Sequence, residues 1–217
     1  MNSQSPKTYR QLRKGEEIAN AITHGIGSLL SIAALVVLII VAGRHDDIWQ
    51  LVSFSIYGCT LILLYLSSTL YHSFSESKLK NLFARFDHIS IFLLIAGTYT
   101  PILLTSMRGV LGWTFFGIIW GLAIAGSVIR SIFLHRFRKL MVVLYLMMGW
   151  MAVLAGKQIY QSLPSISITF LVLGGIAYSA GVIFYMWRSL PYAHGIWHLF
   201  VLAGSILHFF AIYFSIN

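Results

Sequence analysis

The chain has few charged residues and almost no cysteine. Only 10% of its 217 residues are charged, whereas 58% are hydrophobic; soluble domains typically contain about 25% charged residues. Its single cysteine, Cys59, excludes a disulfide framework and a cysteine-based metal site. So few charges cannot cover an ordinary soluble surface, and the mean hydropathy of +0.82 indicates an integral membrane protein.

Acidic residues are scarcer than basic ones. Six Asp and Glu residues face 15 Lys and Arg residues, which gives a formal charge of +9. An excess of this kind can indicate a nucleic-acid partner, but here the basic residues form short clusters between apolar stretches and do not follow one polar face. We therefore expect no nucleic-acid partner and interpret these residues as topology signals and contacts with lipid headgroups.

Seven apolar stretches follow one another, each near the ~20 residues that cross a hydrocarbon core. They cover approximately residues 20–43, 49–72, 88–107, 110–134, 139–160, 166–187 and 194–216. The first is longer than the roughly 7–15 residues of a signal-peptide core, so we expect an uncleaved span. The sequence predicts an all-α integral membrane fold, with an N-terminal segment (1–19) followed by a seven-helix transmembrane domain (20–217).

The basic residues also predict the orientation, because short loops rich in Lys and Arg stay on the cytoplasmic side. With a cytoplasmic N-terminus, twelve of the 15 basic residues lie on that side, and only Arg44, Arg108 and Lys157 lie on the other. We expect the N-terminal segment in the cytoplasm and the C-terminus outside.

Ionisable side chains at membrane depth are costly and mark candidate functional sites. His72 ends the second apolar stretch, Asp87 opens the third, and His194 and His198 open the last. In the predicted orientation all four lie at the cytoplasmic end of their helices. We therefore expect polar groups from three helices to converge on one layer.

The histidine spacing in this layer fits a metal site. His194 and His198 lie one turn apart on one helix face, where two imidazoles can share an ion. A third nitrogen from His72 would leave the fourth tetrahedral position of a zinc ion for water. Asp87 could orient this water or accept its proton, and Ser68, one turn before His72, could donate to the water or to an oxyanion. A plainer interpretation stays open, in which these histidines only form hydrogen bonds between helices.

Two further sets of polar residues lie within the spans. Glu17, Asn20 and His24 are three and four residues apart, so they share one face near the cytoplasmic entrance of the first helix. We interpret them as groups that cap the bundle and form hydrogen bonds beside the site, with a direct role in the chemistry as the alternative. His208 lies about 21 Å along the helix from His194 at 1.5 Å per residue, too far to bind the same ion.

Four motifs resemble those of a known family. They are EEIANAITHGIG (16–27), SSTLYHSF (67–74), FDH (86–88) and HGIWH (194–198). Together they resemble the bacterial hemolysin III proteins, within the progestin and adipoQ receptor group that includes the adiponectin receptors and is distantly related to alkaline ceramidases. The resemblance covers nearly the whole chain and implies a bacterial plasma membrane protein with seven spans and a cytoplasmic N-terminus.

The resemblance also implies a cofactor. In that group a Ser-x-x-x-His, an Asp and a His-x-x-x-His build an intramembrane zinc site. By motif, the resemblance implies Zn²⁺ held by His72, His194 and His198, with Ser68 and Asp87 beside it.

Three functions are compatible with these features. In the first, zinc activates a water that hydrolyses an amide or ester bond of a lipid, with Asp87 as general base and Ser68 as hydrogen-bond donor. The second is a non-enzymatic membrane sensor with a structural zinc. The third is the membrane-permeabilising activity that the family name implies. Family kinship favours membrane-lipid homeostasis, so membrane lipids are the expected partners, and the sequence does not identify protein partners.

Overall fold

The computed structural model describes residues 14–75, 78–134, 136–187 and 189–216, and all regular elements in these ranges are helical. The elements are α1 (Lys14–Ala42), α2 (Ile48–Ser73), α3 (Lys78–Leu104), α4 (Val110–Ile132), α5 (Arg138–Trp150), the 3₁₀ segment η1 (Met151–Ala155), α6 (Gly156–Ser162), α7 (Ser165–Met186), α8 (Ala193–Tyr213) and η2 (Phe214–Ile216). Seven of the helices, with α5, η1 and α6 counted as one, are long and apolar enough to cross a membrane. The predicted seven-span fold is confirmed.

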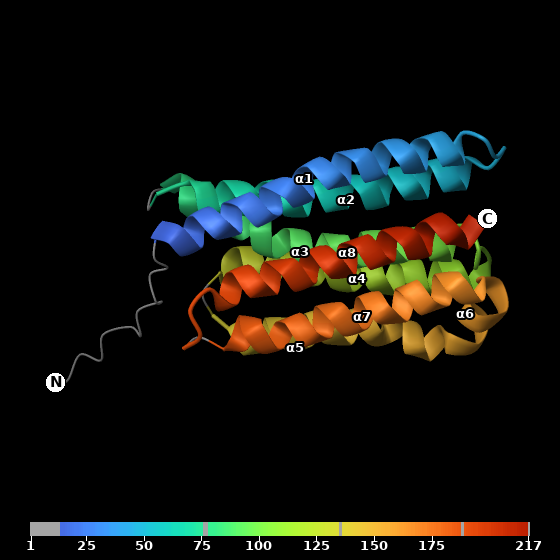
Figure 1. The fold of residues 1–217 in the computed structure, drawn as a ribbon. Helices are drawn as coiled ribbons and strands as arrows, with labels where there is room; N and C mark the ends of the chain where they lie inside the picture. Colours follow the sequence, from blue (N-terminus) through green and yellow to red (C-terminus); the bar gives the residue numbers. More distant parts are fainter. Residues whose placement is uncertain (1–13, 76–77, 135, 188, 217) are drawn as a thin grey trace.

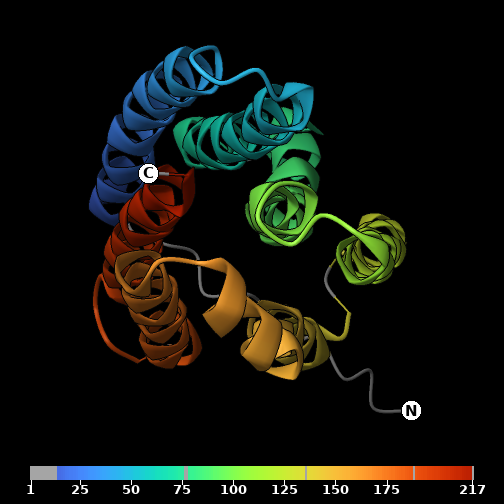
Figure 2. The ribbon, with the colours of Figure 1, turned by 90° about the vertical axis from the view of Figure 1, so that its right-hand side faces the viewer.

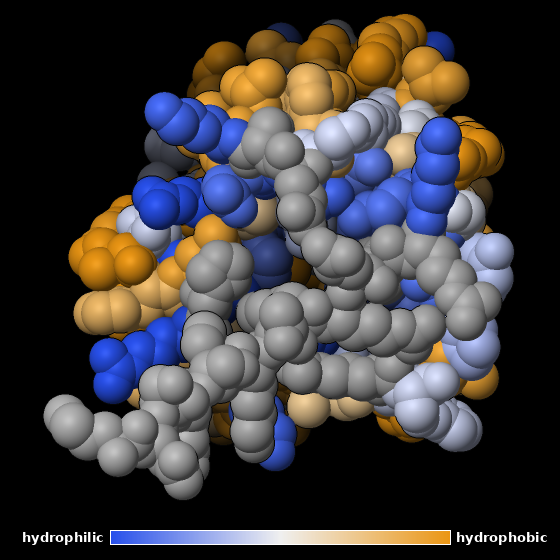
Figure 3. Space-filling model, turned by 90° about the vertical axis from the view of Figure 1, so that its left-hand side faces the viewer, coloured by the Kyte–Doolittle hydropathy of each residue, from blue (hydrophilic) through white to orange (hydrophobic). Residues whose placement is uncertain are grey.

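The spans run side by side along one direction, and α1 begins at the end of the bundle opposite to that at which α8 finishes (Figure 1). Seen along the bundle, the helices follow one another in chain order around a ring, and α8 closes it beside α1 (Figure 2). Hydrophilic side chains gather at the end where α1 begins, flanked by hydrophobic ones (Figure 3). A polar end beside an apolar flank is what a membrane–water boundary requires.

Two helices begin earlier than the apolar stretches predicted. α1 starts at Lys14 instead of residue 20, and α3 starts at Lys78 instead of residue 88. The added turns carry charged residues, which a hydropathy criterion excludes although the helix continues. Lys80 Nζ donates to Glu17 Oε1 over 2.8 Å and thereby links the two extensions. Residues 1–13 of the predicted N-terminal segment lie outside the described residues.

The fifth span is interrupted, although residues 139–160 predicted one continuous helix. Backbone groups freed inside a hydrocarbon layer need partners within the protein. The Tyr99 hydroxyl of α3 serves both a freed N–H and a freed C=O group. It accepts from Ala152 N over 2.8 Å and donates to Gly149 O over 2.7 Å. The break at Met151–Ala155 therefore depends on a side chain from another helix.

Candidate metal centre

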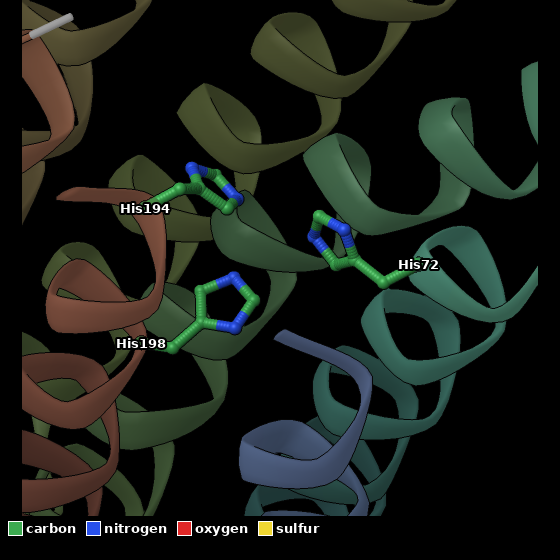
Figure 4. Close-up of side chains that lie close together, drawn as sticks. All are labelled: His72, His194 and His198. Carbon is green, nitrogen blue, oxygen red and sulfur yellow. The ribbon is translucent and has the colours of Figure 1, made fainter. Parts of the chain in front are cut away.

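Three histidines from two helices meet at the end of the bundle where α1 begins. His72 lies in the last turn of α2, and His194 and His198 lie in the first turns of α8. One ring nitrogen from each lies within 4.8 Å of the other two. Figure 4 shows the three rings around a common space. His72 and His198 are buried and His194 is partly exposed, so this group can bind a metal ion.

The start of α8 is fixed by a carboxylate of α1. Tyr192, which precedes the helix, has a left-handed backbone conformation with φ 57°. Its backbone N–H donates to Glu16 Oε1 over 2.9 Å. A free N–H at a helix start needs such an acceptor. Here the bond anchors the start of α8, the helix that carries His194 and His198. Glu16 was not predicted as a functional residue from the sequence, although the motif at residues 16–27 begins with it.

Glu17 determines which nitrogen of His72 is available. His72 Nδ1 lies 2.6 Å from Glu17 Oε2, and because a carboxylate only accepts, Nδ1 carries the hydrogen and donates it. His72 Nε2 is buried and has no hydrogen-bond partner among the described residues. A carboxylate that fixes the tautomer of a histidine is the usual arrangement behind a metal-binding imidazole. The orphaned Nε2 is therefore the atom of His72 suited to bind a metal.

His198 is held by two residues of α1. Its Nδ1 lies 3.3 Å from Thr23 Oγ1, and its ring stacks on His24 with 3.5 Å between centroids and 13° between planes. Thr23 was missed in the sequence because a threonine in an apolar helix is common. Its place between Asn20 and His24, on the polar face of α1, was the signal that could have identified it.

Several other polar atoms near the trio are buried without partners among the described residues. They are Asn20 Oδ1 and Nδ2, both ring nitrogens of His24, and Ser68 Oγ. Buried polar groups are normally hydrogen-bonded, so orphaned atoms that gather in one place indicate a missing polar species such as an ion with its waters. The donor set therefore fits a metal centre: His24 stacks on His198, Asn20 Oδ1 lies close to Gly195, and Ser68 lies one helical turn before His72 on α2.

Asp87 lies at the level of the trio but is not one of the three grouped ligands. It sits in the third turn of α3 rather than at its start, because α3 begins at Lys78. Ser90 Oγ donates to Asp87 O over 2.8 Å and lies 3.3 Å from Ser67 Oγ of α2. Since α2 and α3 are antiparallel, this contact brings Asp87 level with the last turns of α2. Its side chain is 16% exposed, and its carboxylate lies 3.9 Å from His88 Nδ1.

Comparison with known proteins identifies the family. A family model described as haemolysin-III related matches residues 12–209. The chain belongs to this family. It is 51% identical over 201 residues to Hemolysin-3 of Bacillus cereus, covering 93% of this chain and 92% of the relative. It is 52% identical over 199 residues to the Hemolysin-3 homolog of Bacillus subtilis (strain 168), covering 92% and 93%. No solved structure matches.

A more distant match widens the relationship. This haemolysin-III-related chain is 29% identical over 204 residues to the human monocyte to macrophage differentiation factor, covering 91% of this chain and 83% of the relative. That match fits the progestin and adipoQ receptor group expected from the motifs. Together with seven apolar spans, family membership makes the protein a multi-pass bacterial plasma membrane protein.

If the trio binds a metal, removing one imidazole should remove the ion. We expect His72→Ala and His198→Ala to lower the divalent metal content of detergent-purified protein from near one ion per chain to near zero, as measured by inductively coupled plasma mass spectrometry. His88→Ala is the matched control, because its Nδ1 contacts Ala84 O and its ring lies outside the trio. Full metal retention in His72→Ala would rule out this centre.

Replacing Glu17 should weaken metal binding without removing a ligand. In Glu17→Gln the side chain keeps its shape but loses the charge that fixes the His72 tautomer, so we expect about 10- to 100-fold weaker metal affinity in competition with a chelator. Asp47→Asn is the control, since Asp47 pairs with Arg108 over 2.9 Å at the opposite end of the bundle. Unchanged affinity in Glu17→Gln would show that this carboxylate does not support the metal.

Proposed function

We propose that this protein binds zinc and hydrolyses an amide or ester bond of a membrane lipid. The observation that carries the proposal is that the histidine trio neighbours an apolar cavity within the bundle, through side chains that line this cavity. Tyr185 and Trp197 line this cavity. The Tyr185 ring lies 6.1 Å from the His194 ring, and Trp197 immediately precedes His198.

The choice of zinc follows from the ligands. Three neutral imidazoles with room for a fourth ligand are typical of catalytic zinc sites, whereas structural sites are fully coordinated by protein. Magnesium and calcium prefer oxygen ligands, which this trio does not offer. A zinc ion supplies Lewis acidity, which polarises a carbonyl and makes a water nucleophilic.

The cavity has the size and lining of a lipid site. Its volume is about 440 Å³, within the ~300–1,000 Å³ of typical ligand pockets. Apolar side chains from α3, α5, α7 and α8 form most of its wall, among them Leu94, Ile102, Val142, Leu171 and Val201. Such a wall excludes water and accommodates a hydrocarbon chain. A lipid bound there would place its polar linkage beside the imidazoles.

The interrupted fifth span gives the cavity a side that faces the bilayer. Trp150, Val153 and Tyr160 line the cavity and have large exposed fractions, 65% for Val153 and 76% for Tyr160. Trp150 Nε1 donates to Ser179 Oγ of α7 over 3.0 Å, which bridges the two spans that flank this side. The proposed route for a lipid passes these exposed side chains, so the lipid would not leave the hydrocarbon layer.

The proposed roles of the other residues follow from their chemistry. Asp87, level with the trio, is the carboxylate that accepts a proton from the attacking water. Ser68 Oγ, buried without a partner among the described residues, donates a hydrogen bond to the developing oxyanion. Glu17 orients His72. His24 and Asn20 border the site, and His24 supports His198 through ring stacking.

Asp87→Asn tests the catalytic role of this carboxylate. An amide cannot accept the proton, so we expect turnover of a fluorescent lipid amide or ester by purified protein to fall by at least about 100-fold while zinc content stays near one ion per chain. Asp46→Asn, in the exposed loop at the other end, should retain full activity. If Asp87→Asn keeps its full effect on membrane-lipid composition in cells while His72→Ala loses both zinc and fold, zinc is structural and the protein is a sensor.

The names of the two Bacillus relatives motivate one further measurement. Permeabilisation would require the protein itself to make a path for solutes through the bilayer. If lipid hydrolysis is the function, purified protein reconstituted into dye-loaded vesicles should release no more dye than empty vesicles over the time of the hydrolysis assay. Dye release that persists in Asp87→Asn would instead favour a permeabilising protein.

A further inference from the structure

His208 is an ionisable residue inside the membrane that the proposed chemistry does not use. It lies on α8, the helix that also carries His194 and His198, and it lines the far part of the cavity. The fourteen residues between His194 and His208 correspond to about 21 Å of helix. An ionisable side chain at membrane depth is costly and is by default a candidate functional group.

The His208 ring is held in one orientation. Its Nε2 lies 3.1 Å from Leu171 O, and because a carbonyl only accepts, Nε2 carries the hydrogen and donates it. The edge of the ring formed by Cδ2 and Nε2 packs against Gly174 of α7 so closely that a Cβ there would collide with it. The Tyr178 ring lies 5.3 Å away between centroids. These three contacts fix the ring against α7.

The other ring nitrogen is left as an acceptor. In a neutral imidazole with hydrogen on Nε2, Nδ1 carries a lone pair. Nδ1 has no hydrogen-bond partner among the described residues. It is not fully buried, and because His208 lines the cavity, the accessible Nδ1 faces open space. The nearby Tyr178 hydroxyl lies 2.7 Å from Ser205 Oγ and forms no hydrogen bond with His208. The far part of the cavity thus presents a fixed acceptor in an apolar wall.

A plain hydrocarbon chain makes no use of such an acceptor. An acceptor in an apolar environment is favourable only when a donor meets it. A single leaflet contributes about 15 Å of the ~30 Å hydrocarbon core, so a point about 21 Å from the trio lies beyond the midplane, near the end of a long chain anchored at the trio. Within hydrocarbon, a hydroxyl group is the simplest donor.

We propose that His208 forms the far end of a binding site for amphiphiles whose hydrocarbon chain carries a hydroxyl group near its end. The site is the apolar cavity, so this inference rests on the lipid-binding part of the proposed function. It adds a specificity-determining residue to that function: the head of the amphiphile lies beside the three imidazoles, and the hydroxyl donates to His208 Nδ1.

The experiment compares the binding of three radiolabelled acids to detergent-purified full-length protein: hexadecanoic acid, omega-hydroxyhexadecanoic acid and alpha-hydroxyhexadecanoic acid. We expect the omega-hydroxy acid to bind about three- to tenfold more tightly than the unsubstituted acid, the effect of one net hydrogen bond. The alpha-hydroxy acid carries the same group at the wrong end, so its binding should not depend on His208.

Three variants separate recognition from stability. His208→Leu removes the acceptor and should abolish the preference for the omega-hydroxy acid. His208→Gln can donate to Leu171 O and still present a carbonyl oxygen, so it should retain a preference. Ser167→Ala removes another α7–α8 hydrogen bond, from Ser167 Oγ to Ala211 O over 2.6 Å, at a residue that does not line the cavity. It should bind as the wild type does.

The outcomes distinguish the two proposals. Equal binding of hexadecanoic acid and its omega-hydroxy derivative to wild-type protein would overturn the role of His208 and leave lipid binding intact. An unchanged preference in His208→Leu would overturn it as well. If none of the acids binds, the cavity is not a lipid site, and the inference fails together with the lipid-binding part of the proposed function.

Discussion

The hydrogen bond between Glu17 and His72 is the interaction on which the geometry of the candidate metal centre depends. It joins α1 to α2 and determines that Nε2 of His72, not Nδ1, is free for the shared space. A carboxylate at this depth is costly unless it is paired, and Lys80 of α3 provides the second partner. Glu16 makes the matching connection to the start of α8. The first turn of α1 thereby contacts α2, α3 and the start of α8, the three segments that supply or flank the imidazoles.

The hydrocarbon layer imposes a second constraint, on the backbone. Each N–H and C=O inside the layer needs a partner within the protein, and the fifth span departs from helical geometry only where the Tyr99 hydroxyl meets its freed groups. The interruption borders the cavity and not the lipid alone. The same feature thus places an irregular backbone segment in the cavity wall, with Ala152 N–H and Gly149 C=O paired by Tyr99.

The position of the metal centre within the bundle connects it with both water and lipid. The trio lies at the end where hydrophilic side chains gather (Figure 3), and Tyr185, whose ring lies 6.1 Å from that of His194, lines the apolar cavity. In the proposed function, water would come from the headgroup side past the partly exposed His194, and the hydrocarbon part of the lipid would remain in the cavity. A hydrolytic site for lipids needs both environments within a few ångströms, and the boundary of the membrane is where they meet.

The sequence by itself determined the number and order of the spans. The length and hydropathy of each apolar stretch are local properties, and a stretch long enough to cross the bilayer forms a transmembrane helix. It also predicted that His72, His194 and His198 share one layer, since the ends of spans have known depth, and the structure brings one ring nitrogen of each within 4.8 Å of the others. Helix starts at Lys14 and Lys78 were not predictable from hydropathy, because charged turns continue a helix without being apolar.

Only the tertiary structure decided the contacts between segments distant in the sequence. Glu16 with Tyr192, Thr23 with His198, and Tyr99 with the broken fifth span join residues between 53 and 176 positions apart. No local pattern encodes such pairs, because they depend on how seven helices pack around one another. The cavity, and the place of His208 in its wall, arise from that packing for the same reason.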